Sequence, residues 1–514
     1  MPEPYLLGID VGTSVLKCVV FDRQGTEVAI SRRRPTIIRE HPSWSELSMH
    51  DLWEEVKDAL REVTADEAIK DGRIQGVGTT GTCCSSWLVD ENAEPVRNAI
   101  LWNDGRAAEI IGEWQRSDVM DEVFAISGNI IFPGYTVAVL RWLEEHEPET
   151  LQRARWSLFC KDWIRYCLTG EIHTDHTDAA YLPYDIRETR YSSEVLDLCG
   201  VSGTEHLFPP ILDSGDVAGS ILPSVAEQTG LPSDIPVVAG MVDVAASTLG
   251  AGAYKPGQAC SVVGTSFLNN FITEEPTFEP FGVGVQTPSA GGGIIRSMIN
   301  TSGTINLEWF LNQFCAEEKA SAEKAGRSVY DWAEEVAGNI PIGAQGIVYH
   351  PYLNTTGVIA PFLNPAARAQ FFGVSIEHTR AHLLRAVYEG AALSMLDCYA
   401  QIPVEIEEWY ISGGGKRSAF WSQMFSDCTG QRILVPEGVE FGARSVAVLA
   451  GIACGVYDDI EDAMDQVIRI EREHTPNRVA TEKYRQLYEL YKAIYEQLQD
   501  VWWKRHELVK QWAQ

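Results

Sequence analysis

A carboxylate, two hydroxyl groups and a lysine lie close together near the start of the chain, in the run GIDVGTS at residues 8–14 and at Lys17. An apolar stretch leads into Asp10, so this carboxylate is expected at the end of a strand, beside a turn at Gly12 and Thr13. Backbone N–H groups and hydroxyls of such a turn can bind phosphate oxygens, while Asp10 holds hydrated Mg²⁺ nearby. The pattern is short, and an ordinary hairpin turn explains it equally well.

The second half of the chain carries one more hydroxyl turn and a glycine triplet. Gly264-Thr265-Ser266 follows an apolar run at residues 259–263, and it again combines a tight turn with hydroxyl groups. One hydroxyl turn in each half suggests two loops that close on the phosphates of one nucleotide from opposite sides. Gly413-Gly414-Gly415 follows the apolar run at residues 409–411, where absent side chains would let a base or ribose approach the backbone. A plain strand-to-helix turn accounts for the triplet equally well.

Asp243 is the candidate for proton transfer. It ends an apolar run, and small residues follow it in the sequence GMVDVAA at residues 240–246. Phosphoryl transfer to an alcohol needs a group that accepts the hydroxyl proton, and a carboxylate can do this. The local sequence alone favours a simpler interpretation, in which Asp243 is a helix N-cap.

Hydrophobic periodicity predicts the elements that must position these residues. Residues 5–9 and 14–22 are expected to form a β-hairpin, and residues 49–63 an amphipathic helix. Further strands are predicted at residues 74–79, 87–89, 237–239, 259–263 and 409–411, and further helices at residues 140–142, 163–167, around Leu196, 380–395 and 445–451. The order of elements in the first half thus repeats in the second.

The last part of the chain has one long apolar stripe, which runs from Tyr484 to Trp502 at helical spacing. We interpret it as a helix packed on its own domain and not as a groove for a partner. The domain boundary is expected near residues 244–256, where glycine and proline interrupt the pattern.

Length and charge limit the classes of function. At 514 residues the chain exceeds a single core, which stops growing at roughly 250–300 residues, so two domains are expected. Lys and Arg number 41 against 72 Asp and Glu, a formal net charge of −31. A charge of this sign opposes attraction to phosphate backbones and anionic lipid, so nucleic acid is not expected as a partner.

Cysteine usage and hydropathy indicate the compartment. The eleven cysteines have irregular spacing, and only the adjacent Cys83-Cys84 pair is close enough to resemble a motif. Buried, reduced thiols fit this pattern. The chain starts without a signal-peptide pattern, and no apolar run reaches the roughly 18–20 residues that a membrane span needs. We therefore expect a cytoplasmic protein with no membrane partner.

Taken in order, five segments resemble the FGGY family of carbohydrate kinases. They are the Asp10 turn, Trp102-Asn103-Asp104-Gly105-Arg106, Asp243 in its setting, Gly264-Thr265-Ser266 and the glycine triplet. The resemblance extends from Tyr5 to about Gly455. It implies an α/β fold of two ribonuclease-H-like (actin-like ATPase) domains with a cleft between them. The domains would be residues 1–246, for sugar and phosphate, and residues 247–460, for nucleotide, with a helical segment at 461–514 packed on them.

The resemblance also implies a role for each candidate residue, with ATP and Mg²⁺ as cofactors. Asp243 would be the catalytic base, and Asp10 and Asp243 would lie at the metal. The residues expected to bind substrate are Thr82, Cys83, Trp102, Asp104, Arg106 and Asp243. Those expected to bind ATP are Gly12, Thr13, Lys17, Gly264, Thr265, Gly303, Gly413, Gly414, Gly415 and Ser418.

Within this family, residues 301–310 and 378–390 look most like the branch of L-xylulose, erythritol and xylulose kinases. The segment TGTCCS at residues 80–85 departs from Gln-Met-His of D-xylulose kinases and from Gln-Arg-Glu-Thr of glycerol kinases. A ketopentose or a C4–C5 polyol is therefore the favoured substrate.

A homodimer is the expected assembly. The alternative functions are an actin-like ATPase or a sensor that does not turn over a small sugar. Trp102 to Arg106 and Asp243 argue against the ATPase, and Asp10 and Asp243 argue against the sensor.

Overall fold

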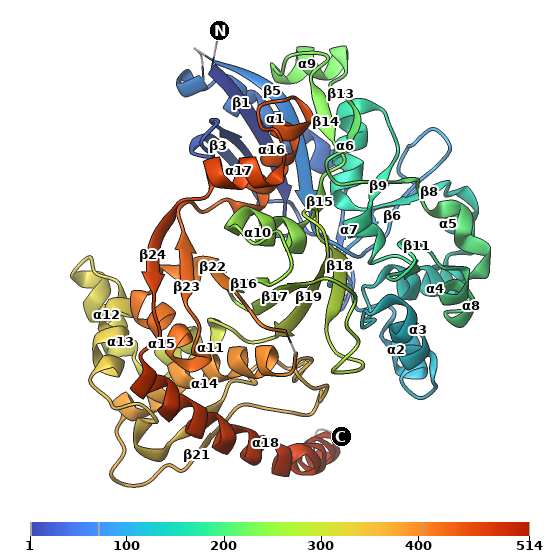
Figure 1. The fold of residues 1–514 in the computed structure, drawn as a ribbon. Coiled ribbons are helices and arrows are strands. Elements are labelled where there is room, and N and C mark those ends of the chain that lie inside the picture. The colour runs from blue at the N-terminus through green and yellow to red at the C-terminus, as the bar shows by residue number, and fades with distance from the viewer. Residues whose placement is uncertain (1–2, 70–71, 403, 513–514) are drawn as a thin grey trace.

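The computed structural model of the chain describes residues 3–69, 72–402 and 404–512. Its two halves each contain a seven-stranded mixed sheet. Figure 1 shows the first sheet at the top and the second below it, with helices α10 (Asp243–Ala251) and α16 (Phe441–Ala453) between them. The predicted two-half α/β architecture is present.

The first sheet is built on the predicted hairpin. Strands β1 (Glu3–Val11), β2 (Leu16–Phe21) and β3 (Glu27–Arg33) are antiparallel neighbours. On the other side of β1, β5 (Gly72–Gly81) runs parallel to it, and β14 (Pro236–Val238) and the two-residue β15 (Met241–Val242) run parallel to β5. An antiparallel edge strand, β13 (Val217–Ser220), completes the sheet. β1 and β2 are buried along nearly their whole length, which explains their continuous apolar runs.

The second sheet repeats this plan. Strands β16 (Gln258–Val263), β17 (Phe267–Thr273) and β19 (Ile294–Asn300) are antiparallel neighbours, with β18 (Val285–Pro288) beyond β19. β22 (Glu408–Ser412) runs parallel to β16, and β23 (Ile433–Pro436) runs parallel to β22. The edge strand β24 (Ile470–His474) pairs with β23, so the segment at 461–514, expected to be helical throughout, contributes a strand to this sheet.

The long helices lie where periodicity predicted them. They are α1 (Met49–Thr64), α14 (Arg380–Ala400) and α18 (Arg478–Trp512). α18 packs on α14 and on α15 (Ala419–Thr429), and the predicted stripe is its buried face. The interpretation of this helix as packed on its own half is confirmed.

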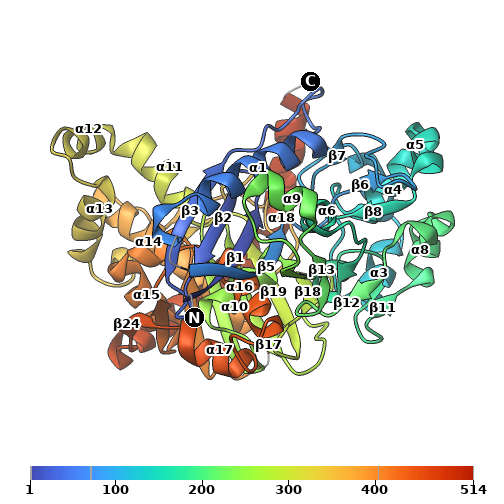
Figure 2. The same cartoon turned by 90° about the horizontal axis from the view of Figure 1, so that it is seen from above.

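Shorter elements complete the structure. The other helices are α2 (Ala108–Trp114), α3 (Val119–Ser127), α4 (Thr136–His146), α5 (Pro148–Arg153), α6 (Cys160–Thr169), α7 (His176–Ala179), α8 (Ser193–Leu198), α9 (Pro223–Thr229), α11 (Ile305–Phe314), α12 (Ala316–Lys324), α13 (Val329–Gly338) and α17 (Ile460–Val467). The other strands are β4 (Glu46–Leu47), β6 (Trp87–Val89), β7 (Ala99–Ile100), β8 (Trp156–Leu158), β9 (Thr174–Asp175), β10 (Tyr184–Asp185), β11 (Arg190–Tyr191), β12 (Ile211–Leu212), β20 (Val348–His350) and β21 (Gln370–Phe372). Seen from above, α3 to α5 and α8 extend to one side of the sheets and α11 to α13 to the other (Figure 2).

The first sheet has a glycine-lined face on which α16 lies. Cβ atoms added at Gly8 in β1 and at Gly78 in β5 would come within 2.0 Å of the Ala443 carbonyl oxygen and 2.2 Å of the Val446 carbonyl oxygen, both in α16. Only glycine permits this approach of helix backbone to sheet. A helix from late in the sequence thus forms part of the core of the first half.

Among the described residues, no helix is both long and apolar enough to cross a membrane.

Candidate active site

Three parallel strands of the first sheet end side by side. In β5, Thr80 is the register partner of both Asp10 in β1 and Met241 in β15. Asp243 follows β15 directly and is the first residue of α10. The carboxyl ends of parallel strands meet at one edge of a sheet, and this edge carries both predicted carboxylates.

The two carboxylates influence each other. Burial and, to a smaller extent, the negative charge of Asp10 together raise the pKa of Asp243 to about 7. Burial also raises the pKa of Asp10, an effect that Lys17 opposes. Asp243 Oδ1 has no hydrogen-bond partner among the described residues. A carboxyl group with such a pKa can accept a proton near neutral pH.

Lys17 lies between two carboxylates. Its ammonium nitrogen is 3.5 Å from Asp10 Oδ2 and 2.8 Å from Glu440 Oε2. Glu440 immediately precedes α16, so Lys17 joins the hairpin of the first half to the start of this helix. The sequence predicted Lys17 as a phosphate contact. In the structure its charge is shared with these two acids.

Trp102 joins the predicted substrate segment to the predicted phosphate turn. Its indole Nε1 donates a hydrogen bond of 2.9 Å to Thr13 Oγ1, and its side chain is 43 % exposed. The backbone N–H of Thr82 donates to the Val11 carbonyl, 3.3 Å away. Trp102, Thr13 and Thr82 therefore lie together at the edge where β1 and β5 end.

Asp104 and Arg106 form a buried ion pair. Their side chains are fully buried, and Arg106 donates to Asp104 through Nε at 2.8 Å and to Glu46 through Nη2 at 2.6 Å. The Asp104 carboxylate also accepts the Ser45 backbone N–H at 2.7 Å, and the guanidinium lies over the Trp44 ring. These internal partners stabilise the buried charges, although Arg106 Nη1 has no hydrogen-bond partner among the described residues. In this structure the pair supports the loop that presents Trp102, and direct contact of the pair with substrate stays a prediction.

Cys83 and Cys84 follow Thr82 at the end of β5. Their sulfur atoms are 3.5 Å apart, and both thiols are free. Cys84 and Ser85 have φ angles of 60° and 93°, a left-handed conformation that side chains rarely adopt. Contact between the two thiols and burial raise the pKa of Cys83 well above its usual range, which favours the protonated thiol.

The turns of the second half gather around the end of β16. The Gly303 backbone N–H donates to the Thr265 carbonyl at 2.6 Å, and the Thr304 N–H donates to the Gly264 carbonyl at 2.8 Å. A Cβ at Gly413 would lie 2.7 Å from the carbonyl oxygen of Val263, the last residue of β16. Three turns that are far apart in the sequence thus form one glycine-lined surface.

Gly414, Gly415 and Ser418 continue from this surface into α15. Gly414 is exposed, and a Cβ there would meet no atom within 4 Å, whereas one at Gly415 would contact Val263. The Ser418 hydroxyl accepts the Trp421 backbone N–H at 2.9 Å and is the N-cap of α15. The backbone near Gly414 is therefore open to a ligand, and Ser418 has a structural role at the start of a helix.

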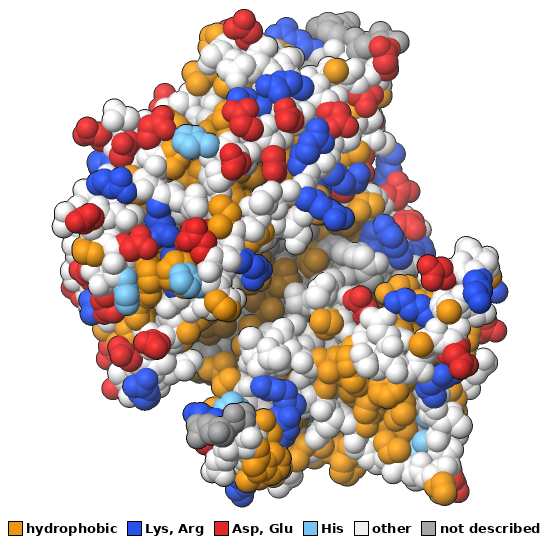
Figure 3. Space-filling view, turned by 180° about the vertical axis from the view of Figure 1, so that it is seen from behind, with side chains coloured by type: hydrophobic (Ala, Val, Ile, Leu, Met, Phe, Trp, Pro, Cys, Tyr) orange, Lys and Arg blue, Asp and Glu red, His pale blue; other side chains and the backbone are white. Residues whose placement is uncertain are grey.

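Seen from behind, the molecule is hollowed at its centre, with apolar side chains in the deeper part and charged ones on the surrounding surface (Figure 3).

Comparison with known families decides the identity. The model of the N-terminal domain of the FGGY family of carbohydrate kinases matches residues 5–250, and that of the C-terminal domain matches residues 259–454. The chain belongs to the FGGY family of carbohydrate kinases. The predicted family and fold class are confirmed, and the protein is a carbohydrate kinase.

Relatives of this FGGY kinase come from several substrate classes. It is 28% identical over 502 residues to the L-xylulose/3-keto-L-gulonate kinase of Escherichia coli (strain K12), covering 96% of this chain and 97% of that one. It is 29% identical over 507 residues to the erythritol kinase of Brucella abortus (strain 2308), covering 97% of both. The crystal structure of xylulose kinase from Rhodospirillum rubrum aligns with a TM-score of 0.86 at 26% identity, covering 97% of this chain and 100% of that one.

Sequence reasoning missed a cluster of charged residues in the FGGY kinase. Lys161 at the start of α6 lies within 3.0 Å of Asp162, Asp175 and Asp178, and all four side chains are buried. Arg165, one turn later, donates to Asp162 and to the backbone carbonyl of residue 239, close to Asp243. Part of the signal was present, since Arg165 stands among apolar residues in the predicted helix at 163–167, but Lys161 and the three aspartates lie outside that segment.

Proposed function

We propose that this FGGY kinase transfers the γ-phosphoryl group of ATP to a hydroxyl of a small sugar or polyol, with Asp243 as the base. The observation that carries the proposal is the place of Asp243: it ends β15 beside Asp10, and its pKa is raised to about 7. A carboxyl group tuned in this way accepts a proton efficiently near neutral pH.

In the proposed step, the substrate hydroxyl oxygen attacks the γ-phosphorus, and the bond between this phosphorus and the β–γ bridging oxygen breaks. The hydroxyl proton passes to Asp243, and ADP leaves. The backbone N–H groups of Gly12, Gly264 and Gly303 donate within their own turns, so the proposed phosphate contacts are the hydroxyls of Thr13 and Thr265 and the exposed backbone at Gly414. Closure of the two halves would exclude water and limit hydrolysis of ATP.

Mg²⁺ is the proposed metal, and the residues present fit it. Asp10 and Asp243 are two neighbouring carboxyl groups whose pKa values are both raised, so a cation beside them would stabilise their ionised forms. Mg²⁺ characteristically binds one or two carboxylates and completes its coordination with water and substrate phosphates. When bound, it supplies positive charge to the phosphates.

The substrate contacts proposed here are Trp102, Thr82 and Cys83. An exposed indole face suits the C–H groups of a polyhydroxylated ligand, and Thr82 supplies a hydroxyl. Asp104 and Arg106 hold the Trp102 loop in place. We propose a ketopentose or a C4–C5 polyol as the substrate class, because the Thr82–Cys84 segment lacks the larger polar side chains of D-xylulose and glycerol kinases.

The remaining features are proposals of the same kind. The proposed domain of residues 1–246 would bind sugar and phosphate, and that of residues 247–460 would bind nucleotide. Helix α16 belongs to the second of these domains but packs on the sheet of the first. Lys17 and Ser418 are proposed as further phosphate contacts, since an ammonium group has three N–H donors and an N-cap hydroxyl retains its own proton. A cytoplasmic location agrees with the free cysteines of the described chain. A homodimer is the proposed assembly.

Substitution of the base tests the activity. Asp243→Asn should lower kcat by a factor on the order of 10²–10⁴, because an amide cannot accept the proton at neutral pH. ATP binding, measured by calorimetry, and the thermal midpoint should stay close to wild type. Asp213→Asn, which removes an exposed carboxylate, is the control. Turnover of Asp243→Asn within about threefold of wild type would contradict the assignment.

A substrate panel tests the acceptor class. Formation of ADP is measured side by side with erythritol, ribitol, L-xylulose, D-ribulose, D-xylulose and glycerol. We expect a C4–C5 polyol or an L-ketopentose to exceed glycerol and D-xylulose in kcat/KM by about tenfold, the effect of one hydrogen bond to a bound hydroxyl. Glycerol or D-xylulose as the best substrate would overturn the proposed class and leave the kinase activity standing.

A further inference from the structure

Among the described residues, the hydrogen bond that orients the Asp243 side chain comes from the backbone N–H of the next residue, Val244. Its Oδ1 atom has no hydrogen-bond partner among the described residues, and it stands at the first position of α10. In many enzymes a third group holds the base in its orientation. Here the direction of the carboxylate depends on the backbone just before α10, so whatever holds that backbone also places the base.

The strand before the base is short and is held from outside the sheet. β15 consists of Met241 and Val242 only, each with one register partner in β5. The backbone N–H of Val242 donates to Thr177 Oγ1 at 2.8 Å, and the Thr177 side chain is buried. The hydroxyl of Thr177 is therefore the side-chain anchor for the residue that precedes Asp243.

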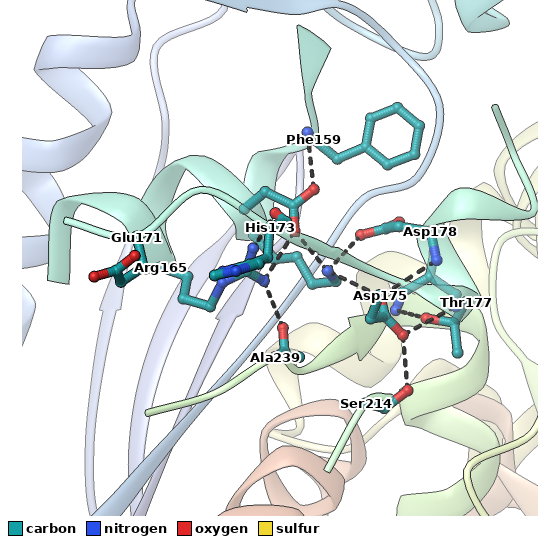
Figure 4. Close-up of polar contacts among 12 residues, drawn as sticks. Phe159, Arg165, Glu171, His173, Asp175, Thr177, Asp178, Ser214 and Ala239 are labelled. Carbon is teal, nitrogen blue, oxygen red and sulfur yellow. Dashed lines mark hydrogen bonds and ion pairs between the residues drawn. The ribbon is translucent and has the colours of Figure 1, made fainter. Parts of the chain in front are cut away.

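Thr177 is itself held by buried charges. It lies in α7, whose N-cap Asp175 accepts the Thr177 backbone N–H at 2.9 Å. Lys161 Nζ lies 2.9 Å from Asp175 and 3.0 Å from Asp178, with all three side chains fully buried. Figure 4 shows Thr177, Asp175 and Asp178 together, with Ser214 donating to Asp175. A buried ion cluster permits little movement, because separating its charges is costly.

The same residue contacts the second half. The Thr177 backbone carbonyl accepts a hydrogen bond of 2.8 Å from Thr287 Oγ1 in β18. One residue of α7 therefore binds the backbone before the base through its side chain and the second sheet through its main chain. The position of β18 and the position of Asp243 are linked by these two bonds.

We propose that Thr177 is a positioning residue for catalysis, which holds the Val242–Asp243 backbone in place and ties it to β18 of the second half. This inference rests on the proposed role of Asp243 as the base. Thr177 takes no part in the chemistry, and it acts through the main chain of Val242.

The test compares two substitutions of Thr177 in the full-length protein, with ATP and the best substrate of the panel. Thr177→Val keeps the shape and removes the acceptor of the Val242 N–H. It should lower kcat by about tenfold or more while both KM values change by less than about threefold, because a displaced base weakens the chemical step and not binding. Thr177→Ser retains the hydroxyl and should restore kcat to within about threefold of wild type.

Two further variants separate positioning from general destabilisation. Thr229→Val is the matched control, since Thr229 is fully buried and its hydroxyl, like that of Thr177, accepts a backbone N–H, here from Leu231. The Thr229 hydroxyl also donates to the Val225 carbonyl within α9. It should lower the thermal midpoint by a similar amount with kcat unchanged. Thr287→Val removes only the link to β18 and should lower kcat several-fold with KM retained. If Thr177→Val does not fold, the kcat of Thr287→Val tests the positioning role.

The outcomes distinguish this inference from the proposed function. If Asp243→Asn is active, the proposed function fails and the inference falls with it. If Asp243→Asn is inactive while Thr177→Val retains wild-type kcat, the inference alone is overturned. The inference is also overturned if Thr229→Val loses as much kcat as Thr177→Val, or if Thr177→Val changes only KM. If Thr177→Val cannot be prepared, wild-type kcat in Thr287→Val overturns it.

Discussion

Asp397 is a buried carboxyl group of the second half, in α14. It accepts hydrogen bonds from the hydroxyls of Tyr488 at 2.6 Å and Tyr495 at 3.3 Å, both in α18. Burial nevertheless raises its pKa to about 6. The folded protein therefore binds a proton at Asp397 more tightly than the unfolded chain does.

This shift predicts a pH dependence of stability. The contribution of Asp397 is fully present below the unfolded pKa, near 4, and is lost as pH rises through the folded value of about 6. Asp397→Asn mimics the protonated acid at every pH. It should raise the free energy of unfolding relative to wild type by about 2–3 kcal/mol at pH 7.5, and the gain should shrink towards pH 4. Chemical denaturation across this range measures it, and a gain that is independent of pH would contradict the assignment.

At the scale of single residues, the sequence predicted the site residues that lie at the ends of strands. Asp10 and Asp243 could be found because each ends an apolar run, and parallel strands bring such ends together. The ion pairing of Asp104 and Arg106 was not predicted, because it includes Glu46, which lies far away in the sequence. The anchoring role of Thr177 could not be predicted, since a threonine in a four-residue helix carries no local signal.

The contact between the two halves depends on the packing of helix α16 against the glycines of β1 and β5. Gly78→Ala would bring a Cβ to within 2.2 Å of the Val446 carbonyl carried by this helix, and neither backbone can yield cheaply. We expect a loss of about 2 kcal/mol or more in the free energy of unfolding, as for overpacking in a core. Gly203→Ala is the control, because a Cβ there meets no atom within 4 Å. A thermal midpoint for Gly78→Ala equal to that of Gly203→Ala would refute the close packing.

At the scale of elements, long periodic segments were predictable and short ones were not. The hairpin of β1 and β2 and the helices α1, α14 and α18 have enough residues to show a period. β15 has only two residues, and its pairing is set by β5. β24 lies at an exposed sheet edge with charged residues among its five, so its sequence resembles the helical segments around it.

The charge of the whole molecule predicts how it responds to salt. With a net charge of −31, compact folding brings like charges together, and mobile ions screen the repulsion. The thermal midpoint should therefore rise as KCl is increased from about 20 mM to about 500 mM, over which the screening length falls several-fold. Sucrose at matched osmolality is the control, since it does not screen charge. A midpoint that stays constant or falls with KCl would show that self-repulsion contributes nothing.

The placement of α16 also bears on how the chain folds as it leaves the ribosome. The glycine-lined face of the first sheet is covered by residues 441–453, which are made some 360 residues after Gly78, the difference between residues 441 and 78. During synthesis, the apolar face of the first sheet therefore stays uncovered until most of the second half has been made. Chains usually fold domain by domain during synthesis, and a face left open in this interval exposes them to aggregation. Each half has its own sheet, yet the first sheet is covered only after residues 441–453 have been synthesised.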